Sequence, residues 1–196
     1  MNQSRAEGFI TIAESFLQSG KSVAAGLYAE SASNLARQEA GTKQVQAELQ
    51  ALERITTRLP KPLEHYTMLL NQAKTVALET RKRAHAPFSN FLVGAALIDE
   101  EEGLHQGCNV ECSSYGLTIC AERTALVSAV AAGKKRFFGV VVAADTDNLT
   151  PPCGACRQLL YDFAPDAVVV LINPRGVEKR FTMKELLPEA FSADFL

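Results

Sequence analysis

Residues 138–172 read FGVVVAADTDNLTPPCGACRQLLYDFAPDAVVVLI, and the fold class follows from this stretch. Its two ends, 138–144 and 167–172, are continuous apolar runs rich in β-branched side chains, which is typical of strands covered on both faces. Between them, residues 153–163 have the period of a helix. Strands that alternate with helices of this length predict an α/β sandwich.

Toward the N-terminus the same alternation continues as far as a proline boundary. The apolar patterns predict helices at 63–84 and 118–132 and strands at 91–98 and 104–110. The acidic turn Asp99-Glu-Glu-Glu-Gly103 joins the two strands into a hairpin. Pro60-Lys61-Pro62 is the boundary, because proline lacks a backbone donor and disfavours helix in the residue before it. We therefore expect one domain at 63–196.

Residues 1–62 form a separate helical extension of unassigned function. Their apolar periods predict three helices within 1–59, interrupted at Gly20 and Gly41. The first two resemble a tetratricopeptide helical hairpin at seven packing positions: Phe9, Ile12, Ala13, Phe16, Gly20, Ala25 and Ala32. A solenoid needs about three or more repeats, so the favoured interpretation is a hairpin that packs on itself or on another subunit.

The composition excludes several classes of protein. With 196 residues, 47% of them hydrophobic and 21% charged, the chain can bury a core and is not intrinsically disordered. No apolar run approaches the roughly 20 residues of a membrane span, and the N-terminus lacks a signal-peptide pattern. The net charge of −2 argues against a nucleic-acid binder. We expect a cytoplasmic protein without membrane or nucleic-acid partners.

Three of the five cysteines stand at predicted helix starts. Cys120 opens one helix, and Cys153 and Cys156 form a C-x-x-C motif at the start of another. Helix N-termini favour thiolates, and three thiolates with one open position match the ligand set of a catalytic zinc site. Two alternatives stay open: a redox pair in the C-x-x-C motif, and a closed four-cysteine site completed by Cys108 or Cys112.

Glu122 distinguishes a catalytic from a structural metal site. A carboxylate beside a zinc thiolate can take a proton from the attacking water and deliver it elsewhere. On a regular helix, however, residues two apart point about 200° away from each other. Cys120 and Glu122 can therefore face one pocket only if Cys120 occupies the irregular cap of the helix.

Several motifs together resemble one known family. Cys120-Ala-Glu-Arg-Thr-Ala125 and Pro152-Cys-Gly-Ala-Cys-Arg-Gln158 resemble the free-nucleoside cytidine deaminases of the small, homotetrameric, three-cysteine type. The resemblance runs from about Leu63 to the C-terminus and includes further motifs: Ala86-Pro-Phe-Ser-Asn-Phe91, Val93-Gly-Ala-Ala96, Gly107-Cys-Asn-Val-Glu111, Ser114-Tyr-Gly-Leu-Thr-Ile-Cys120 and Glu185-Leu-Leu-Pro188. It implies a three-layer α/β/α sandwich with a mixed five-stranded sheet, preceded by the helical extension.

The resemblance also implies an activity and a role for each site residue. The activity is zinc-dependent deamination of cytidine and deoxycytidine in pyrimidine salvage, by a homotetramer with shared active sites. Cys120, Cys153 and Cys156 would bind one zinc ion, Glu122 would transfer protons, and Arg123 would donate to the thiolates. Substrate contacts would come from Phe91, Asn109, Glu111, Tyr115, Ala121 and Phe191. From the residues alone, Phe91 and Phe191 could instead belong to the core.

Two positions depart from the family pattern, and two rival functions remain. Cys112 stands where relatives often have Asn, and Pro151 stands where they commonly have Ser. Neither change touches the zinc ligands or Glu122. One rival is a deaminase of a nucleoside antibiotic such as blasticidin S. The other is a non-catalytic zinc-binding scaffold, against which the presence of Glu122 argues.

Overall fold

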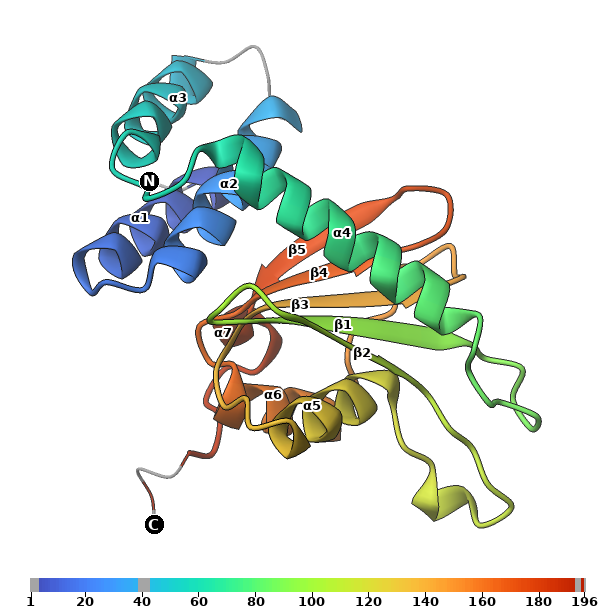
Figure 1. Cartoon of the computed structure of the whole chain (residues 1–196). Coiled ribbons are helices and arrows are strands. Elements are labelled where there is room, and N and C mark those ends of the chain that lie inside the picture. Colours follow the sequence, from blue (N-terminus) through green and yellow to red (C-terminus); the bar gives the residue numbers. More distant parts are fainter. Residues whose placement is uncertain (1–3, 39–42, 193–194, 196) are drawn as a thin grey trace. The chain divides into compact units, whose positions relative to one another are not determined.

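The computed structural model describes residues 4–38, 43–192 and 195, and divides the chain into two compact units (Figure 1). The helical unit is Met1–Leu70 and the sheet unit is Asn71–Leu196. The border falls inside helix α4 (Leu63–Arg81), whereas the pattern of prolines predicts a boundary at residue 62. Within the described residues, no helix is both long and apolar enough to cross a membrane.

The helical unit contains the three predicted helices: α1 (Arg5–Gln18), α2 (Ser22–Gln38) and α3 (Lys43–Thr56). Ser4 caps α1, since its side chain accepts a hydrogen bond from the backbone N–H of Glu7. α1 and α2 pack as a hairpin. The centroid of the Tyr28 ring lies 5.3 Å from the ring centroids of both Phe9 and Phe16. The predicted end of the second helix at Gly41 lies outside the described residues.

The sheet unit is built on the five-stranded mixed sheet that the family resemblance implies. Its strands are β1 (Val93–Asp99), β2 (Leu104–Cys108), β3 (Phe137–Ala144), β4 (Val168–Ile172) and β5 (Glu178–Thr182). They lie in the order β2-β1-β3-β4-β5, and only β3 and β4 pair in parallel. Because the parallel pair needs a crossover, the chain between β3 and β4 carries α6 (Gly154–Phe163) across one face.

Helices cover both faces of this sheet, which confirms the three-layer sandwich. On one face lie α5 (Ala121–Ala131), α6 and the short α7 (Met183–Leu186), and they share an apolar core with β1, β3 and β4 (Figure 1). The second half of α4 covers the other face, where Thr80 donates to Gln106 of β2 at 2.8 Å and Lys74 pairs with Glu178 of β5 at 2.6 Å.

The strand β5 was invisible to the apolar pattern, because charged residues form most of it. Arg180 is buried all the same, and its guanidinium pairs with Glu178 at 2.8 Å. Burial alone raises the pKa of Glu178, but Arg180 and Lys74 outweigh that effect and hold the pKa below its usual value. Ion pairing thus permits a charged strand at the sheet edge, which the apolar pattern does not indicate.

Candidate functional site

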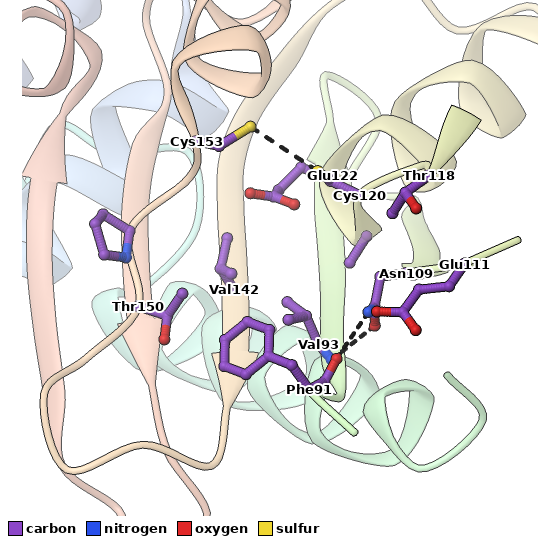
Figure 2. A pocket seen from close by; sticks show the side chains of 12 residues that line it. Phe91, Val93, Asn109, Glu111, Thr118, Cys120, Glu122, Val142, Thr150 and Cys153 are labelled. Atoms are coloured by element: carbon purple, nitrogen blue, oxygen red, sulfur yellow. Dashed lines mark hydrogen bonds between the residues drawn. The ribbon is translucent and has the colours of Figure 1, made fainter. Parts of the chain in front are cut away.

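The first turns of α5 and α6 bring the three predicted cysteines together. Cys120 and Cys153 are the N-cap residues of α5 and α6, both with extended backbone, and Cys156 lies in the first turn of α6. Their three Sγ atoms all lie within 4.8 Å of one another. Those of Cys120 and Cys153, which Figure 2 shows, are 3.9 Å apart. All three thiols are free.

This cluster fits a zinc ion. Tetrahedral coordination with Zn–S bonds of about 2.3 Å places sulfurs about 3.8 Å apart, close to the observed separation. Burial raises the pKa of the Cys156 thiol, and the nearby Glu122 carboxylate adds to that effect. A divalent cation would offset the repulsion among these anionic groups.

Among the five cysteines, all of which are described, the other two lie outside the cluster. Cys108 donates to the carbonyl of Arg83 at 3.6 Å, and Cys112 donates to the carbonyl of Ser114 at 3.1 Å. The alternative of a four-cysteine site is therefore wrong. The third sulfur also distinguishes the cluster from a simple C-x-x-C redox pair.

Glu122 is buried and lines the same pocket as Cys120 and Cys153 (Figure 2). Its carboxyl is also within hydrogen-bonding reach of the Cys156 thiol. The extended backbone of Cys120, with φ −71° and ψ 156°, provides the irregular cap that the sequence required for both side chains to share one pocket. Burial raises the pKa of the Glu122 carboxyl, and its own backbone N–H, Cys156 and Arg123 offset this only in part. A carboxyl with a raised pKa is suited to carrying a proton in both directions.

Arg123 contacts the cluster as the resemblance implies. Its Nη2 donates to the Sγ of Cys120 at 3.5 Å and to the carbonyl of Thr118 at 2.8 Å. The first of these hydrogen bonds and the negative charges of the cluster raise the pKa of the guanidinium. The arginine thus places a permanent positive charge against the Cys120 sulfur.

The pocket above the cluster has a volume of about 200 Å³. Its lining combines residues from the start of β1 and the segment before it, the segment after β2, β3, the start of α5 and the segment before it, and the segment before α6: Phe91, Val93, Asn109, Glu111, Thr118, Cys120, Ala121, Glu122, Val142, Thr150, Pro151 and Cys153 (Figure 2). Five of the predicted site residues, Phe91, Asn109, Glu111, Ala121 and Glu122, therefore share the cavity with Cys120 and Cys153. Val93, Thr118, Val142 and Thr150 were not predicted, because nothing in their residue types indicates a site.

Phe91 and Asn109 form one connected part of the pocket wall. The Phe91 side chain is 41% exposed, so the alternative that it belongs to the core is wrong. The Asn109 amide donates to the carbonyl of Phe91 and accepts from the N–H of Val93, both at 2.8 Å. Asn109 thus ties the start of β1 to the segment that carries Phe91, and each end of its amide keeps one further hydrogen-bonding position.

Glu111 lies between this pocket and a neighbouring one of about 300 Å³, which is also lined by Phe88, Ser89, Tyr115 and Thr118. The Ser89 hydroxyl donates to Oε1, and the backbone N–H groups of Phe88 and Ser89 donate to Oε2 at 2.9 and 3.2 Å. The Ser89 hydroxyl and the Phe88 N–H contribute most to holding the pKa of Glu111 below its usual value. Three of its roughly four acceptor positions are used.

Tyr115 and Phe191 do not line the pocket above the cysteine cluster of their own chain. Tyr115 is 72% exposed, and its ring contacts that of Phe88 with centroids 5.2 Å apart. Phe191 is 57% exposed and stacks on Phe195 at 5.7 Å. The alternative that Phe191 fills the core of its own chain is wrong.

Comparisons with known proteins agree on one family. The family model described as "Cytidine and deoxycytidylate deaminase zinc-binding region" matches residues 68–172. A cytidine deaminase of Halalkalibacterium halodurans is 45% identical over 119 residues, which cover 60% of this chain and 90% of the relative. A blasticidin-S deaminase of Bacillus cereus is 35% identical over 104 residues, 49% of this chain and 74% of the relative.

A solved structure agrees with the sequence comparisons. The crystal structure of a cytidine deaminase from Burkholderia pseudomallei matches with a TM-score of 0.60 and 44% identity. The match covers 62% of this chain and 98% of that chain. The helices α1 to α3 lie outside the residues that the family model matches.

Proposed function

Since the chain belongs to the family of zinc-binding cytidine and deoxycytidylate deaminases, we propose that it hydrolyses cytidine and deoxycytidine to uridine and deoxyuridine. The observation that carries the proposal is the convergence of three free thiols, two of which line the pocket, with the buried carboxyl of Glu122. The products would feed the salvage of pyrimidine nucleosides.

The chemistry divides between the thiols and Glu122. Cys120, Cys153 and Cys156 hold zinc, which when bound supplies Lewis acidity toward water. As the water oxygen bonds to C4, Glu122 takes one proton from it and gives that proton to ring N3. Glu122 then takes the second proton from the same oxygen and carries it to the departing amine. The C4–N bond breaks, and ammonia and the uracil nucleoside leave.

Two polar groups account for recognition of the sugar. The unused acceptor position of Glu111 is suited to a ribose hydroxyl donor, and the free positions of the Asn109 amide can donate to and accept from the same sugar. The Glu111 carboxylate would repel a phosphate placed close to it. We therefore propose nucleosides, rather than nucleotides, as substrates.

The base would contact Phe91 and Ala121. The exposed Phe91 ring offers a stacking surface at the pocket wall. Ala121 is fully buried and is the first residue of α5, where a backbone N–H has no partner within the helix. That N–H is free to bind an oxygen of the base.

A homotetramer with shared active sites would explain the exposed aromatic residues. Tyr115 and Leu117, in the segment before α5, are 72% and 69% exposed, and Phe191 lies near the C-terminus. We infer that these exposed side chains belong to an interaction surface. We propose that Tyr115 and Phe191 complete the active site of a neighbouring subunit.

The test is an assay of four compounds. The purified protein is incubated with cytidine, deoxycytidine, CMP and blasticidin S, and the loss of cytosine absorbance is followed. We expect turnover of the two nucleosides and not of CMP. Turnover of neither nucleoside would refute the proposal, and turnover of blasticidin S alone would support the antibiotic rival.

A further inference from the structure

We propose that Arg175 and Asn173, in the turn between β4 and β5, are positioning residues that fix the substrate-facing wall of the pocket. They act on the segment 145–151, which leaves β3 and contributes Thr150 and Pro151 to the lining. Neither residue touches the pocket itself. The inference rests on the proposed deaminase function and deepens it.

The Arg175 guanidinium contacts three residues of this segment: Asp145, Thr146 and Asp147. Its Nη2 donates to the carbonyl of Thr146 at 2.8 Å, and its two terminal nitrogens pair with Asp145 and Asp147, each at 3.0 Å. The carboxylates are about half exposed and fully exposed, so their ion pairs contribute little. The charge-assisted hydrogen bond to the carbonyl is the stronger contact.

Asn173 holds the same carbonyl from inside the fold. It is almost completely buried, and its amide nitrogen donates to the carbonyl of Thr146 at 3.1 Å. Its amide oxygen accepts from the backbone N–H groups of Arg175 and Val177, both at 3.1 Å. Asn173 therefore stabilises the turn that contains Arg175, and it also binds the segment 145–151 that Arg175 contacts.

Thr146 connects these hydrogen bonds to the pocket through its contact with Thr150. Its hydroxyl lies 3.0 Å from the hydroxyl of Thr150, at hydrogen-bonding distance. Thr150 and Pro151 line the pocket directly (Figure 2 labels Thr150). The contacts thus form a series from Arg175 and Asn173, through Thr146, to the wall.

A different arginine, Arg157, holds the chain next to the proposed zinc ligands Cys153 and Cys156. Nε of Arg157 donates to the carbonyl of Pro152 at 2.8 Å, and its Nη1 donates to the carbonyl of Leu186 at 2.9 Å. This arginine fixes the entry to α6 and therefore Cys153. Loosening the wall should consequently weaken substrate binding while the metal site stays intact.

The test uses Arg175→Ala, Asn173→Asp and Thr146→Val, together with the double variant R175A/T146V. Asn173→Asp keeps an oxygen for the turn and removes the donor to Thr146, and Thr146→Val removes only the hydroxyl. Arg136→Ala is the matched control, because Arg136 is a 68% exposed arginine of the sheet unit paired with Glu100 at 3.8 Å. The readouts are KM and kcat for cytidine, bound zinc and the thermal midpoint.

We expect each single variant to raise KM about three- to tenfold with kcat within about twofold and zinc unchanged. The double variant should exceed the larger single effect only slightly, because the two residues act in series. Arg136→Ala should match the wild type. Unchanged KM, multiplicative effects in the double variant, or zinc and kcat lost together would each overturn the inference. If the wild type deaminates neither nucleoside, the proposed function fails instead.

Discussion

Both units contain buried glutamates, but Glu122 of the sheet unit lies beside a reactive cluster and Glu48 of the helical unit does not. In α3, Glu48 is 3% exposed and accepts a hydrogen bond from Ser4, while its Oε2 has no partner among the described atoms. In α5, Glu122 is 4% exposed and shares a pocket with cysteine thiols. A buried carboxylate alone is therefore weak evidence of catalysis, and the convergence of other reactive groups on it is the stronger signal.

The largest expected effect comes from making the same substitution in both units. Glu122→Gln removes the proton carrier, so kcat for cytidine should fall by about 10²- to 10⁴-fold or more, with zinc retained. Glu48→Gln, the matched control in the helical unit, should leave kcat within about twofold. Steady-state kinetics and metal analysis of both variants provide the measurement. A large loss of kcat from Glu48→Gln would remove the functional contrast between the units.

A second pair of variants tests close helix packing in the two units. A Cβ at Gly107 in β2 would collide with the α5 backbone at Ala121 and Ala125, and one at Gly26 in α2 would collide with the Tyr66 ring. Each Gly→Ala change should cost about 1–3 kcal/mol of stability. Only Gly107→Ala should also lower kcat/KM, by about tenfold or more, because it displaces the helix that carries Glu122. Thermal unfolding and kinetics would measure both effects, and equal kinetic losses would contradict this expectation.

The acid response of the sheet unit gives a smaller effect. Burial alone raises the pKa of Asp99, but hydrogen bonds from His105, from the backbone of Gly103 and Glu101, and from Lys134 outweigh it and hold the pKa below its usual value. Asp99 therefore stabilises the fold above its unfolded pKa of about 4, and this contribution is lost as the pH falls through the lower folded pKa.

Asp99→Asn should accordingly destabilise the chain by about 1–3 kcal/mol at pH 7 and by progressively less in acid. Urea unfolding at a series of pH values would measure the difference. Glu100→Gln, at a neighbouring and more exposed carboxylate, should change the free energy of unfolding by less than about 0.5 kcal/mol. A difference for Asp99→Asn that stays constant in acid would show that its charge is not the cause.

The smallest expected effect is that of deleting residues 1–61. The truncation keeps α4 whole, and the relative from Halalkalibacterium halodurans aligns over 90% of its length with only 60% of this chain. We expect kcat/KM for cytidine to stay within about threefold and the proposed tetramer to persist in solution. Light scattering and kinetics of the full and truncated chains would check this. Dissociation of the truncated protein would assign the helical unit to assembly.

The sequence predicted the reactive residues of the candidate site better than the residues that hold the pocket in place. Cys120, Cys153, Cys156 and Glu122 could be named because few residue types perform this chemistry and their spacing restricts the options. The strand β5 could not be predicted, because its buried residue Arg180 is charged. Its ion pair with Glu178 permits that burial, and an apolar pattern does not show ion pairs. The double use of the Asn109 amide and the contacts of Arg175 with Thr146 depend on segments far apart in the chain, so no local pattern could predict them.

The three hydrogen bonds to Glu111 have an entropic consequence. A glutamate at a surface normally samples several rotamers, and immobilising such a side chain on binding costs about 0.5–1.5 kcal/mol. Ser89 and Phe88 hold this carboxylate in place before any ligand arrives. The side-chain entropy of Glu111 is therefore lost when the protein folds and not when a ligand binds. A hydroxyl that binds Glu111 then gains nearly the full free energy of its hydrogen bond.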